Sequence, residues 1–298
     1  MTSALLELEQ VCCTVQDVTV LDHVTLQTTG DRVGLAGKTA GISALLIGEA
    51  TLTAGKFVVL GAQLDQARAN HVFGCAVAPQ HIPKKWTVRR ALELAAQVAG
   101  DTGGEAAKRA VAVAEAIGEP SLLKCRWSRA LPIEQALATL ALGLVTDPPL
   151  LFVRLPMGAL EPTASARYTA ALTRATQGRA LLAEIARPPA HAGELEWVES
   201  LSSVSYVFDG RDVGSSGPPS QAKVRYILRV AGDATSVENA MTKAGLGATP
   251  IHAPSDWSRG RCAFLVDVDR DPEGVADTGP VLDVCIDMDL TVLELLPV

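Results

Sequence analysis

The sequence lacks the residue patterns that mark several common classes of protein. Its six cysteines include no Cys-x-x-Cys pair and its five histidines are dispersed, so neither zinc-ligand spacing nor a disulfide framework is visible. We therefore expect reduced, buried thiols and no metal site. Aromatic residues make up only 4% of the chain. However, 48% of residues are hydrophobic and 20% are charged, and this composition excludes an intrinsically disordered protein.

A surplus of positive charge is also missing. The net charge is −7 and the basic residues look scattered, so we expect no nucleic-acid partner. The most apolar stretch, residues 136–153, is broken by Asp147 and two prolines and cannot form one membrane-spanning helix. Residues 1–10 have no basic start and carry two glutamates, unlike a signal peptide. The sequence therefore predicts a cytoplasmic location.

The chain of 298 residues is long enough for one large domain and one small one. Alternating apolar and polar residues over 4–29 predict two antiparallel strands joined by a turn at Gln16 and Asp17. Residues 32–35 predict a strand that enters a glycine-containing loop, and residues 43–49 have helical spacing. Strand, glycine loop and helix in this order are typical of a phosphate-binding site.

The middle of the chain alternates between helical patterns and short apolar strands. Strands that are apolar on both faces and separated by helices predict a parallel sheet covered on both sides. The expected helices span 88–99, 104–117, 132–145 and 163–177, and the expected strands span 150–153, 180–185 and 203–208.

Residues 209–222 are rich in glycine, serine and proline and predict a boundary between domains. Beyond it we expect a small α+β unit over 223–298. It should contain a strand at 223–230, a helix at 234–244, and strands at 261–268 and 281–287. The large domain is expected to cover residues 1–212, with a helical subdomain at about 83–145.

The order and spacing of these segments resemble the ATP-binding subunits of ABC transporters over about residues 4–215. The remainder resembles the C-terminal extension of exporter-type members, including the ending at 290–296. Residues 147–162 match, position by position, the family's run of Asp-Pro, apolar strand, Asp-Glu-Pro and Thr-Ser-Gly-Leu-Asp-Pro. The resemblance implies an α/β fold: an ABC-type P-loop nucleotide-binding domain with an antiparallel β subdomain and a helical subdomain, plus the small C-terminal domain.

The family's phosphate loop, GxxxxGK[ST], is incomplete in this chain. Gly41 and Ser43 match, but Ile42 stands at the lysine position, and the first glycine falls on Gly37 only if the loop is one residue shorter. Since that lysine makes charge-assisted bonds to phosphate, its loss should cost roughly 1.5 to 3 kcal/mol for each bond. Lys38 lies inside the loop and is either a solvated lysine or a substitute cation.

The family's two metal-supporting and catalytic acids are missing as well. Arg154 and Leu155 occupy their positions, which reverses the local charge and should repel magnesium. We expect Arg154 to pair with an acid such as Glu161 rather than to contact a phosphate. The resemblance also places Ala186 at the switch histidine and Val15 at the adenine-stacking aromatic.

The signature loop that caps the partner's ATP in the family becomes Leu131, Pro132, Ile133 and Glu134 in this chain. Pro132 suits the first turn of a helix, so the helix should survive. The serine contact to the γ-phosphate should be lost. Glu134 also places a negative charge where a phosphate would arrive.

These losses together predict a pseudo-ATPase: no enzyme activity, no required cofactor, no metal and at most weak ATP binding. The resemblance implies a peripheral location on the inner membrane face, with a membrane permease, a second cassette subunit or a second copy of this chain as partner. Gln80 takes the position of the family's metal-sensing and nucleotide-sensing glutamine, and with Trp86 and Trp127 it forms the expected docking surface. A nucleotide sensor without turnover and a slow ATPase using Lys38 remain as alternatives.

Overall fold

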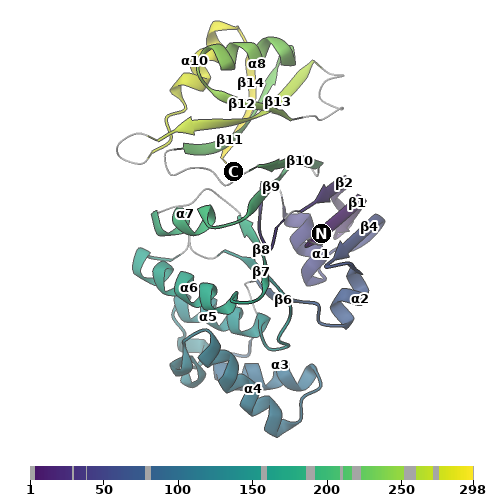
Figure 1. Ribbon diagram of the computed structural model, residues 1–298, viewed down its shortest axis with the longest axis vertical. Coiled ribbons are helices and arrows are strands. Elements are labelled where there is room, and N and C mark those ends of the chain that lie inside the picture. Colours follow the sequence, from purple (N-terminus) through teal and green to yellow (C-terminus); the bar gives the residue numbers. More distant parts are fainter. Residues whose placement is uncertain are drawn as a thin grey trace.

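Three β-sheets, each associated with helices, make up the computed structural model of the chain (Figure 1). The model describes residues 4–28, 30–37, 39–77, 82–155, 160–185, 192–208, 211–216, 223–251, 260–270 and 275–297. No helix in these ranges is long and apolar enough to cross a membrane.

The first sheet is antiparallel and opens the chain, as the alternating pattern predicted. Its strand order is β2-β1-β4-β5, and Gln16 and Asp17 form the turn between β1 and β2 with φ angles of 48° and 66°. Two successive positive φ angles are typical of the type I′ hairpin turn, whose twist matches that of its strands. The strands are β1 (Leu6–Val15), β2 (Val18–Gln27), β4 (Thr51–Val59) and β5 (Ala62–Gln63).

The central sheet has the order β10-β9-β3-β8-β7-β6, and its five strands from β9 to β6 are parallel. The predicted parallel sheet is thus confirmed. The sheet also extends into the segment where a domain boundary was predicted, because β10 pairs antiparallel with β9 and continues the sheet to residue 216. The strands are β3 (Arg32–Gly37), β6 (Phe73–Ala76), β7 (Leu150–Arg154), β8 (Ala180–Ile185), β9 (Ser203–Phe208) and β10 (Arg211–Ser216).

Helices separate the central strands and lie close to the predicted spans. Two buried clusters form the core, one with the antiparallel sheet and α1, the other with the helices from α3 to α6. The helices of this part are α1 (Ala40–Ile47), α2 (Leu64–Ala69), α3 (Val88–Val98), α4 (Gly103–Ala116), α5 (Pro132–Gly143), α6 (Pro162–Ala175) and α7 (Ala192–Glu199), with short 3-10 helices at Pro120–Lys124 and Trp127–Arg129.

The C-terminal residues form a third, antiparallel sheet with the order β12-β13-β11-β14 and a core of their own. The strand predicted at 281–287 is wrong: this segment is a helix, because Val281, Val284 and Cys285 are buried at helical spacing and Pro280 occupies the first turn. The elements are β11 (Lys223–Ala231), α8 (Ala234–Lys243), β12 (Gly247–Ile251), β13 (Arg261–Asp269), α10 (Gly279–Asp287) and β14 (Thr291–Pro297).

The C-terminal sheet contacts the large domain through β11 and β13. Arg225 donates from Nε and one terminal nitrogen to the two carboxylate oxygens of Asp267, at 2.6 and 2.9 Å, and from the other to the hydroxyl of Tyr206 on β9 at 3.1 Å. Ile227 and Leu265 join the core of the large domain. The domain boundary itself stays a prediction. The helical subdomain with α3 and α4 lies at the opposite end of the molecule (Figure 1).

Candidate functional site

The loop between β3 and α1 has the tight geometry expected of a phosphate loop. Gly37 ends β3 with a φ of 84°, and a side chain there would collide with the carbonyl oxygen of Val207 on β9. Thr39 is the N-cap of α1, and its carbonyl oxygen accepts hydrogen bonds from the N–H groups of Ile42 and Ser43 at 2.9 and 3.1 Å. The predicted arrangement of strand, glycine loop and helix is therefore present.

The side chain at the lysine position belongs to the hydrophobic core. Ile42 is fully buried in the cluster that also contains Leu21 of β2. Gly41 lies against the same strand, since a Cβ at this position would collide with the side chain of Leu21. The first turn of α1 is thus packed onto the antiparallel sheet, and the Ile42 side chain contributes apolar contacts there.

Glu184 joins three elements at the carboxyl ends of the central strands. Its Oε2 accepts a hydrogen bond from Arg154 Nε at 2.6 Å, and its Oε1 accepts one from the hydroxyl of Thr39 at 2.9 Å. The Glu184 side chain is only 4% exposed, whereas Arg154 is 36% exposed. The guanidinium, the carboxylate and the hydroxyl thus connect β7, β8 and the N-terminus of α1.

The pairing of Arg154 with an acid is confirmed, but the expected partner was wrong. Glu161 is the exposed N-cap of α6, whereas Glu184 is the direct neighbour of Arg154 on the adjacent parallel strand. Adjacent parallel strands bring such a pair together without any reach by the side chains. Leu155 lies beside this pair and donates its N–H to the carbonyl of Glu184 at 3.3 Å.

The residues present do not fit a magnesium ion. Magnesium requires oxygen ligands with near-octahedral geometry, but the end of β7 holds the guanidinium of Arg154. Both oxygens of the nearby Glu184 carboxylate already accept hydrogen bonds. Ser43 keeps a fully buried hydroxyl that has no hydrogen-bond partner within the described ranges. Among the described residues, the site therefore presents the Ser43 hydroxyl and a cation where a metal would need anionic ligands.

The signature-loop segment caps its own helix. Pro132 begins α5, and the Glu134 carboxylate turns back to accept the N–H of Leu131 at 2.8 Å and the thiol of Cys125 at 3.5 Å. Burial, together with the bond to Glu134, raises the pKa of the Cys125 thiol. Ile133 is buried, and Leu131 is 61% exposed. The helix start that would receive a phosphate in the family is thus occupied by a carboxylate of this chain.

The two tryptophans of the expected docking surface lie on neighbouring backbone segments. The N–H of Trp127 donates to the carbonyl of Trp86 at 2.9 Å, and the N–H of Ser128 donates to the carbonyl of Lys84 at 3.1 Å. Both indole side chains are partly buried, and Trp127 packs against the core of the helical subdomain. The structure thus brings together the two aromatic candidates that the sequence separates by forty residues.

Three candidate residues, Lys38, Gln80 and Ala186, lie outside the described residues. The sequence analysis missed Glu184 as the partner of Arg154, although an acid within the apolar run 180–185 was a visible signal. The role of Thr39 was also missed, because it depends on where the folded chain positions the N-terminus of α1.

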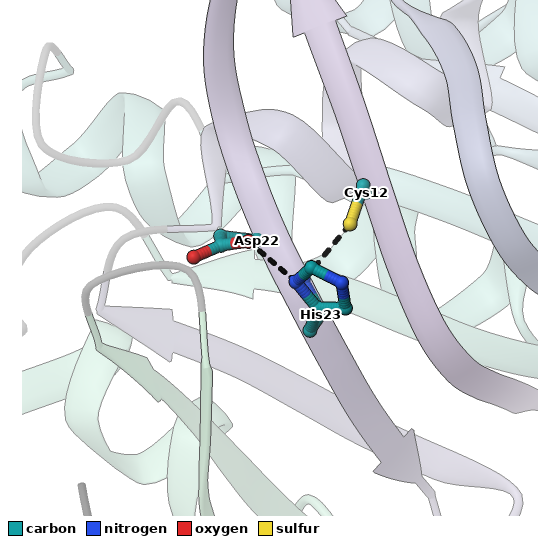
Figure 2. A group of neighbouring side chains, drawn as sticks. All are labelled: Cys12, Asp22 and His23. Carbon is teal, nitrogen blue, oxygen red and sulfur yellow. Dashed lines mark hydrogen bonds and ion pairs between the residues drawn. The ribbon is translucent and has the colours of Figure 1, made fainter. Parts of the chain in front are cut away.

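A second cluster that the sequence did not show lies on the β1–β2 hairpin (Figure 2). Cys12 Sγ accepts the backbone N–H of His23 at 3.2 Å, and His23 Nδ1 lies 2.6 Å from Asp22 Oδ1. The positive φ of 53° at His23 interrupts the regular strand beside Asp22. These side chains hydrogen-bond within the hairpin, far from the β3–α1 loop in sequence, and the expectation of no metal site stays a prediction.

Comparisons with known proteins identify the fold. No family model and no curated protein matches the sequence. Solved structures do match. One is described as the ATP-binding subunit of an ABC transporter, with a TM-score of 0.57 at 15% identity, covering 81% of this chain and 93% of that one. Another is cbiO1 of Clostridium perfringens, part of the cbiONQ transporter complex, with a TM-score of 0.58 at 14% identity, covering 73% and 90%.

A third similar structure is a dimeric ATP-binding cassette bound to ADP and phosphate, with a TM-score of 0.58 at 15% identity, covering 72% of this chain and 99% of that one. This chain has the fold of an ATP-binding cassette. The cassette fold accounts for the β3–α1 loop and for the meeting of Thr39, Arg154 and Glu184 at the carboxyl ends of the parallel strands. At these identities the likeness establishes the fold and leaves the activity to be argued from the site.

Proposed function

We propose that this chain is a cassette subunit without ATPase activity that acts as a docking or regulatory component of an ABC transporter or a related membrane machine. The bonded group of Thr39, Glu184 and Arg154 is the observation that supports this most strongly. Arg154 stands at the end of β7, where the family resemblance implies a metal-supporting carboxylate, and Glu184, an acid that lies beside it among the described residues, is committed to structural bonds. The proposed function is therefore carried by the surface of the fold rather than by turnover.

Each missing group removes a separate contribution to hydrolysis. Loss of a general base alone lowers a rate by about 10² to 10⁴. Ile42 supplies no amine to the phosphates, and a guanidinium at Arg154 repels magnesium by its charge. The carboxylate of Glu134 at the start of α5 adds repulsion toward any phosphate presented by a partner. Because these defects are independent, restoring one of them leaves the others in place.

The proposed partners are a membrane permease, a second cassette subunit or a second copy of this chain at the inner face of a membrane. One structurally similar protein is described as part of a transporter complex and another as a dimer. We place the permease contact on the surface of Gln80, Trp86 and Trp127, because half-buried tryptophans are effective anchors in partner pockets. Cytoplasmic, membrane-peripheral localisation follows from this proposal.

An assembly assay tests the docking role. The tagged chain is co-expressed with its membrane permease, and Trp86→Ala is compared with Ser43→Ala. We expect Trp86→Ala to weaken assembly roughly thirtyfold, which corresponds to about 2 kcal/mol, with a melting temperature close to that of the wild type. Ser43→Ala should leave assembly unchanged. Assembly that is sensitive to Ser43 and indifferent to Trp86 would contradict the proposal.

A nucleotide sensor without turnover is the second candidate. The buried, unpartnered hydroxyl of Ser43 and the partly exposed guanidinium of Arg154 favour it, since both could contact a phosphate at the start of α1. Binding of a fluorescent ATP analogue that is independent of magnesium and lost in Ser43→Ala would support the sensor. Magnesium-dependent binding with turnover would instead support the slow ATPase.

A further inference from the structure

Two short segments of the helical subdomain contain an unusual share of the positive charge. Residues 84–90 (KKWTVRR) hold four basic residues and residues 124–129 (KCRWSR) hold three, and neither segment contains an acid. The whole chain has 26 basic residues and a net charge of −7. In the sequence the basic residues look scattered, because these two segments lie forty residues apart.

The fold places the two segments side by side. Backbone hydrogen bonds connect them at three points: Val88 to Cys125 at 2.9 Å, Trp127 to Trp86 at 2.9 Å, and Ser128 to Lys84 at 3.1 Å. The first two of these bonds make up an antiparallel β-bridge between Thr87 and Arg126. We call the surface formed by residues 84–90 and 124–129 the basic surface. It belongs to the subdomain at the end of the molecule opposite the C-terminal sheet (Figure 1).

The cations of the basic surface point into solvent, and most are not neutralised. All seven side chains are exposed. Arg89 and Arg90 lie 4.0 Å from Glu93, whereas five others form no ion pair with any described residue: Lys84, Lys85, Lys124, Arg126 and Arg129. Glu134 is the acid that lines the hollow beside Lys124, Arg126 and Arg129, but its carboxylate is held by the Leu131 N–H and the Cys125 thiol.

Apolar groups accompany these cations. Trp86 and Trp127 are partly buried between the segments, and the guanidinium of Arg90 lies 5.9 Å from the ring centroid of Trp86. Leu131 follows the second segment directly and is 61% exposed. Tryptophan is favoured at the boundary between water and lipid because it has an apolar body and a polar N–H. The basic surface thus combines cations with the amphipathic side chains suited to that boundary.

We propose that the basic surface binds the phosphate headgroups of an anionic lipid bilayer. Clusters of four to eight basic residues bind acidic membranes with about 1 kcal/mol for each cation, and seven lie here. Single-stranded nucleic acid would need exposed ring faces for base stacking, whereas both tryptophans are partly buried. The exposed Leu131 side chain can bury its apolar surface at a lipid bilayer, whereas phosphate groups alone offer it no apolar contact. The basic surface includes Trp86 and Trp127, so it shares one face of the subdomain with the proposed permease contact, and the inference rests on the proposed function for the presence of a membrane.

The test is co-sedimentation of the full chain with lipid vesicles, without any permease. Vesicles of phosphatidylcholine alone are compared with vesicles that also contain phosphatidylglycerol, at low and at high salt. The test variant changes Lys84, Lys85, Lys124 and Arg129 to glutamine. The matched control makes the same four-charge change, three lysines and one arginine, at exposed positions elsewhere: Lys56, Lys108, Lys243 and Arg261.

We expect the wild type and the control variant to bind the anionic vesicles at low salt, to lose binding at high salt and to ignore the neutral vesicles. The test variant should bind at least about a hundredfold more weakly, since each removed cation accounts for roughly fivefold. Matching thermal melts for the two variants show that folding is intact.

Equal loss of binding in both variants would overturn the proposal, because it would assign the effect to net charge alone. Equal binding to neutral vesicles, or no vesicle binding combined with tight binding of oligonucleotides or polyglutamate, would also overturn it. These outcomes are independent of the assembly assay with the permease. Loss of permease docking with vesicle binding retained would refute the docking role and leave the lipid inference standing.

Discussion

The cassette fold uses charge in opposite ways at two places. At the carboxyl ends of the central strands, the Glu184 carboxylate is buried and both of its oxygens are bonded inside the protein. On the basic surface, seven cations are exposed and five have no acidic partner among the described residues. The first arrangement contributes to stability and uses both carboxylate oxygens for hydrogen bonds inside the protein. The second contributes little to stability and remains available to a partner.

The two regions differ in how much free energy is lost when a charged side chain loses its partner. A buried charge that loses its partner costs several kcal/mol, whereas an exposed one costs almost nothing. Substitutions in the two regions should therefore have very different effects on the free energy of unfolding.

Ile42→Lys should reduce stability most, although it recreates the lysine of the family's phosphate loop. The Ile42 side chain is fully buried beside Leu21, so the variant loses its apolar burial and introduces a charge into the core. We expect a loss of about 3 to 5 kcal/mol in the free energy of unfolding, measured by urea denaturation, and no gain of ATPase activity. A variant as stable as the wild type would show that the loop is more open than described.

Glu184→Ala should have the next largest effect. The change leaves the Thr39 hydroxyl and the Arg154 guanidinium without their acceptor. Breaking a buried pair costs about 3 to 5 kcal/mol, and we expect about 2 to 3 here because Arg154 is 36% exposed and partly screened by water. Glu49→Ala, at an exposed glutamate, is the control and should change stability by less than about 0.5 kcal/mol.

The double variant Arg154→Leu with Glu184→Leu should recover most of that loss. Replacing both members of a buried pair by apolar residues is often neutral, because no charge remains without a partner. We expect a residual loss of about 1 kcal/mol from the buried Thr39 hydroxyl, which still lacks its acceptor. Urea denaturation of the single and double variants gives the coupling. Additive effects would show that the two side chains do not interact.

The smallest effect on stability is expected on the basic surface. Lys84→Gln with Lys85→Gln removes two exposed charges that have no acidic partner among the described residues. We expect a change of less than about 0.5 kcal/mol in the free energy of unfolding, or a slight gain from reduced repulsion. A large loss measured by urea denaturation would mean that these lysines are structural, and the contrast between the two regions would fail.

The sequence predicted the large domain well where one periodic pattern was sufficient. The helix predicted at 88–99 is α3 (Val88–Val98), and the strand predicted at 180–185 is β8 (Ala180–Ile185). Prediction from the sequence failed where the local amino-acid composition favours one secondary structure and the contacts of the folded chain favour another. Val281 and Val284 favour a strand as β-branched residues but are buried as part of a helix, and the glycine-rich and serine-rich segment 211–216 pairs with β9.

At the candidate site, the sequence predicted which positions differ from the family's motifs, and those differences stay a prediction. Register alone placed Ile42 and Arg154 at positions that need a lysine and an acid. Which acid pairs with Arg154 depends on strand order, because β8 lies between β3 and β7 and brings Glu184 next to both Arg154 and the α1 N-cap. The basic surface was hidden for the same reason, since residues 84–90 and 124–129 meet only through backbone bonds of the folded chain.

ATP turnover by the purified chain in the presence of magnesium tests the central claim most directly. Since Arg154 is bonded to Glu184 where a carboxylate should support the metal, and Ile42 is buried where an amine should contact the phosphates, we expect no phosphate release above background. The double variant Arg154→Leu with Glu184→Leu should be equally inactive. Magnesium-dependent turnover that is abolished by Lys38→Ala would contradict the account.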